Sequence, residues 1–394
     1  MSWTSITKQT RWKVWLKAGG RCEYRGCNKS LWRDDLTMKQ LNRSYLAHII
    51  ADSPDGPRGR EGLSDELNDE FENIMLLCDT HHRLIDSEEV EEHPPELLRK
   101  YKREHEERIE RLTGIESDHG THILLFGTKI ATHRGEVNHD QARQAVLPDR
   151  YPNTERGIRL DLNDTGIDES SPSYWTAVKE AIDGRVGRLI ERKKGPKGNP
   201  IEHLSVFGLA PIPALAYLGR RIGDTIPADV YQRHRETGDW QWTEKKEDPC
   251  SYIVDQPSDD GIGKEGSDSS SARSEQSSES VAVRLSLSGD VLRTDVEEAL
   301  DRRPPLYTIA IDDPRRDFLR LEEELERFRK TWTSLLAEIR GAHGLDVEIH
   351  LFPAVPNSVA VEIGRTQLPK SDPPVHIYDH DKNQGGFTHA LTLT

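Results

Sequence analysis

Three cysteines and one histidine near the start of the chain have the spacing of a metal site. Cys22 and Cys27 are separated by four residues, and Cys78 and His81 by two. A structural zinc ion takes four thiolate or imidazole ligands in a tetrahedron, and short-spaced pairs are typical of zinc knuckles. Three of the four cysteines in the chain belong to these pairs. We therefore predict a structural Zn²⁺ bound by these four residues, with unrelated buried cysteines as the alternative.

A second group of polar residues surrounds the same segment. His82 follows the predicted zinc ligand His81, and Asp86 comes four residues after His82, so the last two share one face of a helix. Such residues suit a nuclease with one divalent ion, which needs a base, a group that orients the base, and ion ligands. We predict His48 as the base and Asn73 as the positioning residue. His82 and Asp86 are then the ligands of a catalytic Mg²⁺ or Mn²⁺.

Hydrophobic patterning outlines the elements that must position these residues. We expect a helix over residues 6–18, a short β-strand over 44–51 that carries His48, and a helix that begins near Asp79. A further helix is expected over 94–113. The predicted nuclease residues would therefore come from one strand, one helix and the loops around them.

The charge of the chain is distributed unevenly. The net charge of −15 opposes a general attraction to nucleic acid. Residues 1–46, however, contain ten Lys and Arg residues against three acidic residues, a local balance of +7. A basic module of this kind suits local contact with a phosphate backbone, although an ordinary solvated helix face can have the same composition.

The length of 394 residues suggests two or three domains, and we predict a first domain over 1–115 and a second over 116–394. No apolar run approaches the roughly 20 residues that span a bilayer. The first residues lack the apolar core of a signal peptide. We therefore expect a cytoplasmic protein with no membrane segment. The Ser- and Asp-rich stretch 257–280 is predicted to be a disordered insertion.

Strands and helices alternate in the second domain, which indicates parallel α/β units. An outline repeat joins a strand, a Pro-containing turn, a helix and a Gly-Arg pair. Its copies contain Ala210-Pro-Ile-Pro213 with Gly219-Arg220, and Pro353-Ala-Val-Pro356 with Gly364-Arg365. The repeat predicts two fused Rossmann-like lobes, whose ligands bind at the carboxyl ends of strands, near helix N-termini. The predicted strands are 122–127, 204–209, 281–287, 307–311 and 347–352, and the predicted helices are 174–194, 214–222 and 314–340.

The polar residues of the first domain resemble the HNH endonuclease family over about residues 20–90. The resemblance implies an α+β domain of ββα-metal fold, in which His48 is the first His of the motif, Asn73 the Asn and His82 the last His. Asp86 takes a position at which relatives have His, Asn or Asp. Many members carry an acidic metal ligand directly before the first His, where this chain has alanine. The ion would then depend on His82, Asp86, water and substrate.

Several motifs of the second domain together resemble the SAVED domain, over about residues 120–394. The SAVED domain is the cyclic-oligonucleotide sensor of bacterial antiphage (CBASS) systems. The matching motifs are Phe207-Gly-Leu-Ala-Pro-Ile-Pro213, Leu218-Gly219, Val230-Tyr-Gln-Arg-His234, Trp240-Gln-Trp242, Pro353-Ala-Val-Pro-Asn-Ser358, Gly364-Arg365 and Val375-His-Ile-Tyr378-Asp379. The fusion implies a nuclease that is idle until a cyclic di- or trinucleotide binds. Assembly into a higher homo-oligomer, a dimer and then a tetramer, would activate cleavage of double-stranded DNA.

A cyclic nucleotide presents flat bases and phosphates, which aromatic rings and arginines bind by stacking and by charge-assisted hydrogen bonds. The candidate ligand-binding residues are Trp242, Tyr231 and Tyr378 for stacking, Arg233, His234 and Arg365 for phosphate or base contacts, and Pro211 and Pro356 for shaping the turns. Core packing is the alternative for Trp240 and Trp242. Because these two alternate along the chain, only one of them is expected to face a pocket.

Two other functions fit the same sequence. One is a zinc-containing DNA-binding regulator, whose sensor controls binding without cleavage. The other is a modification-dependent restriction endonuclease, in which the large domain reads modified bases. The first predicts retarded but intact DNA, and the second predicts cleavage of modified DNA without any second messenger.

Overall fold

The computed structural model describes residues 6–34, 37, 39–128, 135–162, 171, 173–187, 200–243, 250–257, 280–381 and 385–394. The chain forms two compact units, Met1–Glu116 and Ser117–Thr394, which are described one at a time. The predicted insertion over 257–280 lies almost wholly outside the described residues, as does the end of the predicted helix 174–194. Within the described part of the chain, no helix is both long and apolar enough to cross a bilayer.

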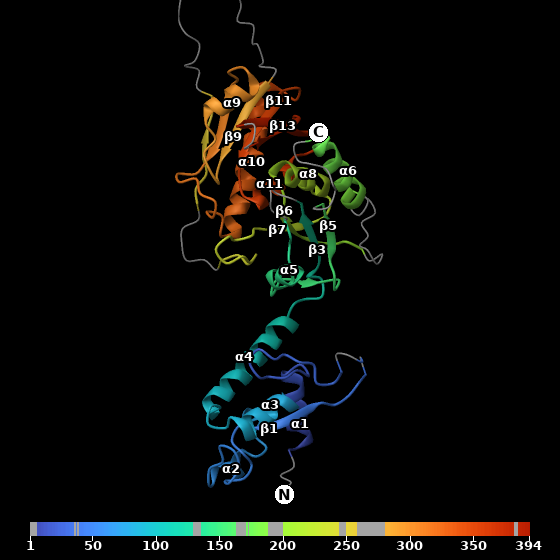
Figure 1. Cartoon of the computed structure of the whole chain (residues 1–394), viewed down its shortest axis with the longest axis vertical. Coiled ribbons are helices and arrows are strands. Elements are labelled where there is room, and N and C mark those ends of the chain that lie inside the picture. The colour runs from blue at the N-terminus through green and yellow to red at the C-terminus, as the bar shows by residue number, and fades with distance from the viewer. Residues whose placement is uncertain are drawn as a thin grey trace, which may run out of the picture. The chain divides into compact units, whose positions relative to one another are not determined.

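The first unit is built around a two-stranded antiparallel sheet (Figure 1). Its elements are α1 (Lys8–Lys17), β1 (Ser44–His48), α2 (Leu63–Leu67), the 3-10 turn η1 (Phe71–Asn73), β2 (Ile74–Cys78), α3 (Asp79–Arg83), the π-helical turn η2 (Leu84–Glu88) and α4 (Pro95–Thr113). The register places Ser44 opposite Cys78 and His48 opposite Ile74. Strand β2 continues directly into α3, so the sheet and the helix that carry the predicted site residues are joined without a loop.

Strand β2 forms the centre of this unit. All five of its residues are buried, which is typical of a strand covered on both faces. Val14 of α1, its C-cap residue Ala18 and Leu98 of α4 belong to the same apolar cluster as the strand. This packing fixes the ends of β1 and β2, where the predicted nuclease residues lie.

The first lobe of the second unit is a parallel sheet with helices around it. Its strands are β3 (Gly120–Gly127), β4 (Tyr151–Pro152), β5 (Ile158–Asp161), β6 (Leu204–Leu209) and β7 (Ala228–Tyr231), and its helices are α5 (His139–Ala145), α6 (Tyr174–Ile182), the π-helical η3 (Asp183–Gly187) and α8 (Ile212–Ile222). The strand order is β4–β3–β6–β7, and β5 also pairs with β3. Strand β3 is buried along its whole length, as a central parallel strand should be.

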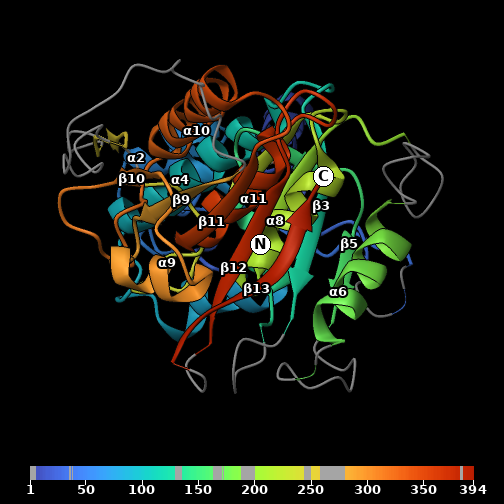
Figure 2. The same ribbon diagram turned by 90° about the horizontal axis from the view of Figure 1, so that it is seen from above.

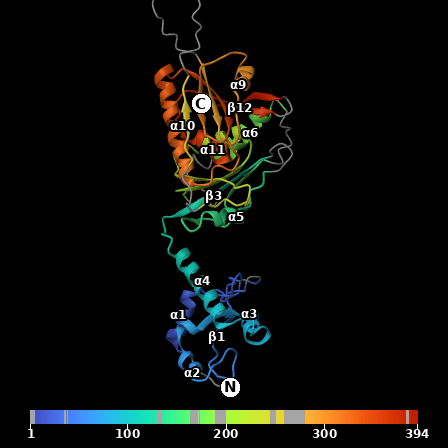
Figure 3. The ribbon, with the colours of Figure 1, turned by 90° about the vertical axis from the view of Figure 1, so that its left-hand side faces the viewer.

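The second lobe is a six-stranded mixed sheet. Its strands are β8 (Ile253–Asp255), β9 (Ser280–Ser286), β10 (Leu306–Ala310), β11 (Glu348–Ala354), β12 (Val375–Asp381) and β13 (Gly386–Leu393), and its helices are α9 (Arg293–Leu300), α10 (Glu322–His343) and α11 (Asn357–Thr366). The order is β13–β12–β11–β9–β10–β8. The four inner strands are parallel, and the two edge strands are antiparallel to their neighbours. Helix α10 runs along one side of this lobe (Figure 3).

Helices α8 and α11 run side by side between the two sheets (Figure 2), and one apolar core contains residues of both sheets and both helices. The two glycines of the repeat lie at their contact. A Cβ on Gly219 would overlap the carbonyl oxygen of Val361, and a Cβ on Gly364 would overlap that of Ala216. Each glycine therefore lets one helix backbone approach the other, which gives the Gly-Arg repeat a packing role.

Helix α10 begins at Glu322, whereas the apolar spacing predicted a helix from residue 314. The Glu324 carboxylate accepts hydrogen bonds from the backbone N–H groups of Arg320 (2.8 Å) and Leu321 (3.0 Å), which fixes the helix start at this point. Phe318 lies in the turn before the helix and is still buried. Apolar spacing alone did not separate this buried turn from the helix that follows it. The five predicted strands agree with the structure to within two residues.

Candidate functional site

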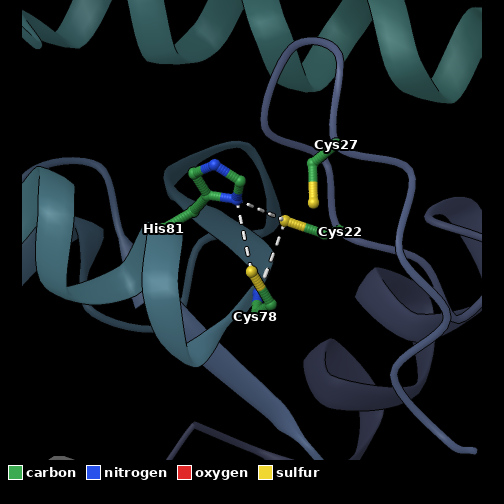
Figure 4. Close-up of side chains that lie close together, drawn as sticks. All are labelled: Cys22, Cys27, Cys78 and His81. Atoms are coloured by element: carbon green, nitrogen blue, oxygen red, sulfur yellow. Dashed lines mark hydrogen bonds between the residues drawn. The ribbon is translucent and has the colours of Figure 1, made fainter. Parts of the chain in front are cut away.

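The four predicted zinc ligands are turned toward one another (Figure 4). Their sulfur and imidazole nitrogen atoms all lie within 4.8 Å of one another. His81 Nδ1 is 3.2 Å from Cys78 Sγ and 3.6 Å from Cys22 Sγ. Around a tetrahedral zinc ion with bonds of about 2.3 Å to sulfur and about 2.0 Å to nitrogen, such pairs lie about 3.5 Å apart. The donor set and its spacing therefore fit Zn²⁺.

Local backbone structure brings these residues together. Cys27 lies in a tight turn, in which its N–H donates to the carbonyl of Tyr24 at 3.0 Å. Cys78 is the N-cap residue of α3, and its N–H donates to Cys22 Sγ at 3.4 Å. The His81 ring stacks on Tyr24 with centroids 4.0 Å apart and planes 6° apart. The turn after α1 is thus joined to the point where β2 becomes α3.

The protonation of these ligands depends on burial. Burial raises the pKa of the Cys22 and Cys27 thiols and lowers the pKa of the His81 imidazole. Each group is therefore held in its neutral form when no cation is present. A cation that binds thiolates must displace their protons, and its affinity falls as the pH falls.

Asn73 holds the segment that follows β1. Its side chain is buried, and its Oδ1 accepts a hydrogen bond from Ile50 N at 2.9 Å. Its Nδ2 donates to Ile50 O at 2.9 Å and to Leu67 O at 3.1 Å. Its backbone carbonyl accepts from Ile49 N at 2.7 Å. All of these contacts are to backbone groups, which is the geometry of a positioning residue.

His48, the last residue of β1, is half-buried, and its Nε2 lies 2.8 Å from the carbonyl oxygen of Asn68. Because a carbonyl oxygen only accepts, Nε2 carries the hydrogen, and Nδ1 is the nitrogen that can take up a proton. Ala47 beside it is buried in the core. The strand therefore offers no acidic side chain next to His48.

His82 and Asp86 form a pair across the turn from α3 into η2. His82 Nε2 lies 3.3 Å from Asp86 Oδ2, and both side chains are partly exposed. Two ligands of one ion with bonds of about 2.1 Å lie about 3.0–3.4 Å apart, so this pair fits a hard divalent cation. The Tyr45 ring from β1 stacks on His82 at 4.6 Å. Within the described residues, no side-chain hydrogen bond, ion pair or ring contact joins His48 to this pair.

Arg58, whose guanidinium reaches the same region, was not predicted from the sequence. It donates to Asp86 Oδ1 at 2.6 Å and to the backbone carbonyl of Ile49 at 2.6 Å. The only signal for this residue was its place in a Pro- and Gly-rich loop. Such composition predicts a turn but not the direction of a side chain.

In the second unit, polar residues gather where α11 begins. Pro356 is the N-cap residue of α11, and the next two residues make contacts with the first lobe. Asn357 Nδ2 donates to Gly208 O at 3.0 Å. Gln232, directly after β7, accepts hydrogen bonds from the Ser358 backbone (3.1 Å) and hydroxyl (2.9 Å). These bonds join the two lobes at the carboxyl ends of β6 and β7.

The two tryptophans that follow β7 differ in burial. Trp240 is buried and meets the Phe207 ring edge-on at 5.2 Å, and Tyr231 stacks on the same Phe207 ring at 4.5 Å. Trp242 is only partly buried, with its ring 6.0 Å from that of His234. Burial also lowers the pKa of His234. Packing thus uses Trp240 and Tyr231, and Trp242 is the more accessible ring.

This two-lobed unit has a family match. The profile described as "SMODS-associated and fused to various effectors sensor domain", SAVED, matches residues 182–393. The chain belongs to the SAVED family. The match covers both lobes from η3 onward, and it leaves the first unit and residues 117–181 outside.

Solved structures of SAVED receptors share low sequence identity with this chain. Two are of the Acinetobacter baumannii Cap4 SAVED/CARF-domain containing receptor. The structure of this receptor with the cyclic trinucleotide 3'3'3'-cAAA is 12% identical over 84% of this chain, with a TM-score of 0.44. The structure with 2'3'3'-cAAA is 13% identical over 84% of this chain, with a TM-score of 0.42. The Moraxella osloensis Cap4 receptor is 12% identical, covering 84% of this chain and 69% of its own (TM-score 0.39). This chain spans 61% of the length of the Acinetobacter receptor. No curated protein matches the chain.

Two residues predicted to bind the SAVED ligand lie inside the unit. Tyr378 is buried, stacks on Phe352 at 4.5 Å, and places its hydroxyl 3.1 Å from His350 Nδ1. Arg365 bonds to the Glu362 carboxylate and to the backbone carbonyl of Ala228, both at 2.9 Å. Like Tyr231, these side chains are used in packing and in joining the lobes, so their ligand roles stay predictions.

Other predicted ligand residues lie nearer the surface of the SAVED unit. Arg233 is exposed just after β7. Pro211 is the N-cap residue of α8, as Pro356 is of α11, so both turns open helices as their sequences predicted. Gln232, which sequence reasoning did not select, stands between Arg233 and the start of α11. Its one signal was its place within the motif Val230-Tyr-Gln-Arg-His234.

Proposed function

We propose that this chain is an antiphage defence effector of the CBASS type. In this proposal the SAVED unit binds a cyclic di- or trinucleotide and activates a metal-dependent HNH endonuclease in the first unit, which degrades double-stranded DNA. The observation that carries the nuclease half is the His82–Asp86 pair next to the predicted zinc cluster, with His48 at the end of the adjacent strand. Membership of the SAVED family carries the sensor half. We further propose that ligand binding drives a dimer into an active tetramer.

The proposed chemistry divides the roles among these residues. A divalent ion, Mg²⁺ or Mn²⁺, held by His82 and Asp86 would stabilise the charge that develops on a scissile phosphate. His48 accepts a proton from water at Nδ1, because Nε2 is committed to Asn68. Asn73 keeps the end of β1 in place through its backbone contacts. The zinc cluster has no part in the chemistry and holds the start of α3.

Helix α1 supports the proposed contact with DNA. Its exposed side chains include four cations and no acid (Lys8, Arg11, Lys13 and Lys17), together with Trp12 at 67% exposure. Lys17 pairs with the Glu110 carboxylate at 3.0 Å. The other cations would neutralise phosphates and release counterions, so binding should weaken as salt rises. An exposed tryptophan among these cations adds contact area without sequence specificity. This surface explains how a chain of net charge −15 could still approach DNA.

The start of α11 is the part of the SAVED unit best suited to a phosphate. A helix N-terminus presents unpaired N–H groups and a positive dipole end. Here the Ser358 N–H is held by the Gln232 side chain, a neutral group that a phosphate oxygen can replace. Arg233 and Trp242 lie on the segment that continues from Gln232. We therefore propose this end of the two lobes as the ligand site.

The proposed function is tested with the full-length chain, supercoiled plasmid, Mg²⁺ or Mn²⁺, and a panel of cyclic di- and trinucleotides that includes both cAAA isomers. We expect cleavage with one ligand and none without it. His48→Ala should abolish cleavage, because His48 is the proposed acceptor of the proton of water. His119→Ala is the matched control, since His119 is exposed and lies in the other unit.

Each alternative function has a distinct result in the same assay. A ligand-controlled regulator would retard the plasmid and leave it intact. A modification-dependent restriction enzyme would cut modified plasmid with no cyclic nucleotide present. Cleavage that persists at the wild-type rate in His48→Ala would contradict the assignment of the base.

A further inference from the structure

The loop that follows His48 is folded so that Arg58 points into the first unit. The Arg58 side chain is only 5% exposed. Its φ of +58° is a left-handed conformation that residues with a Cβ seldom adopt. Gly59 permits this path, because a Cβ there would overlap the carbonyl oxygens of Ser53 and Pro54. The backbone of the loop is therefore strained at the residue whose guanidinium is buried.

The buried guanidinium joins the end of the strand that carries the proposed base, His48, to the turn that carries one proposed ion ligand, Asp86. Its Nε donates to Ile49 O at 2.6 Å, and its Nη2 lies 3.4 Å from His48 O, both at the end of β1. Its Nη1 donates to Ile85 O at 2.5 Å, and Nη2 also donates to Asp86 Oδ1 at 2.6 Å, both in η2. One side chain thus spans the distance between the strand of the base and the turn of the ion ligands.

We propose that Arg58 is a positioning residue of the nuclease site, acting through Asp86. By binding Oδ1, it leaves Oδ2 turned toward His82 Nε2, 3.3 Å away, as the oxygen available to a cation. Ala47 supplies no further ligand, so an ion held by only two side chains depends strongly on their orientation. This inference rests on the proposed function in one respect, the assignment of His82 and Asp86 as ion ligands.

The contacts require an arginine. A guanidinium has five N–H donors in a planar fork and can meet several acceptors at once, whereas an ammonium is a single point charge on a flexible stem. Lysine at position 58 would keep the charge but could not reach the carbonyls of Ile49 and Ile85 together with Asp86. Residues that orient a metal ligand typically change metal affinity or activity by about 10–100-fold when replaced.

The test is a Mn²⁺ titration of the full-length, zinc-loaded chain, followed by the electron paramagnetic resonance signal of free Mn²⁺. We expect Arg58→Lys to bind Mn²⁺ about 10–100-fold more weakly than the wild type. Arg60→Lys is the matched control and should bind as the wild type does, because Arg60 is exposed in the same loop. DNA cleavage by Arg58→Lys should fall in parallel and recover in part at raised Mn²⁺.

Zinc content and a cooperative thermal melt establish that each variant is folded. Arg58→Gln is a second variant, since it leaves no unpaired buried cation if Arg58→Lys does not fold. A purely structural Arg58 would lower the melting temperature while the folded variant kept wild-type Mn²⁺ affinity, and this would overturn the proposal. So would a wild-type chain that binds no Mn²⁺. Tight Mn²⁺ binding without DNA cleavage would reject the nuclease function and still decide the role of Arg58.

Discussion

Replacing Cys78 by alanine should unfold the first unit and leave the SAVED unit folded. Cys78 ends β2 and caps α3, with its sulfur 3.2 Å from His81 Nδ1 and its N–H bonded to Cys22 Sγ. The substitution removes one of four ligands at the point where the sheet becomes the helix. It therefore detaches the start of α3 from the turn after α1.

The expected loss of stability follows from the contribution that a structural zinc makes to the folding free energy of a small domain. Zinc binding contributes about 10–16 kcal/mol of apparent folding free energy in zinc-finger peptides at pH 7. The net stability of a domain of this size is about 5–15 kcal/mol. Losing even half of the zinc contribution, about 5–8 kcal/mol, would remove most of that stability. The SAVED unit has its own apolar core and should be unaffected.

The assay is calorimetric unfolding of the full chain together with its zinc content. The wild type should bind one zinc and show separate transitions for its two units, and Cys78→Ala should lose the zinc and the transition of the first unit. Cys250→Ala is the matched control, because Cys250 belongs to the SAVED unit and is not one of the four clustered residues. A Cys78→Ala chain that keeps one zinc and both transitions would refute the reasoning.

Two further predictions concern the SAVED unit. Gly364→Ala should destabilise it by about 1–3 kcal/mol in urea unfolding, because the added Cβ would overlap the Ala216 carbonyl oxygen. Gly341 of α10 has open space around it, so Gly341→Ala should stabilise the SAVED unit by about 0.5–1 kcal/mol. Equal changes in stability for Gly364→Ala and Gly341→Ala would contradict the packing argument. Burial lowers the pKa of His350 to about 4 in the folded unit, compared with about 6.5 in the unfolded chain. The free energy of folding that depends on neutral His350 is therefore fully present above pH 6.5 and is lost as the pH falls toward 4. Between pH 7 and pH 4.5, His350 should lower the free energy of unfolding measured in urea by about 2 kcal/mol. His350→Gln should show a smaller loss over the same pH range, and an unchanged pH dependence in that variant would contradict the role of His350.

Local sequence predicted what local contacts determine. The predicted zinc ligands occur as two short-spaced pairs, and each pair is held by its own turn or helix cap, so their spacing was enough to predict that they group together. His82 and Asp86 likewise share a helical turn. The parallel pairing of the first lobe and of the four inner strands of the second followed from the alternation of strands and helices, whereas the antiparallel edge strands β8 and β13 were not predicted. The Gly-Arg repeat correctly marked equivalent helices, α8 and α11.

Contacts between distant segments decided what the sequence did not show. Tyr231 and Tyr378 have the residue types of base-stacking groups, yet each is packed on a phenylalanine of a neighbouring strand. Arg365 has the character of a phosphate ligand, yet Glu362 one helical turn before it binds the guanidinium. An aromatic ring or a guanidinium can either bind a ligand or pack inside the fold. Only the structure therefore shows which of the two roles each residue has. The alternation of Trp240 and Trp242 was the exception, because period-two spacing already placed them on opposite sides.

The candidate nuclease site depends on three clamps that act on different parts of the backbone. The zinc cluster joins the turn after α1 to the start of α3, and Asn73 joins η1 to the segment after β1. Arg58 joins that same segment to η2. Arg58 is therefore the one of these three clamps that contacts both the segment of the predicted base and the turn that carries Asp86. The predicted site draws on residues far apart in the chain, and the residue that connects its two halves belongs to no chemical motif.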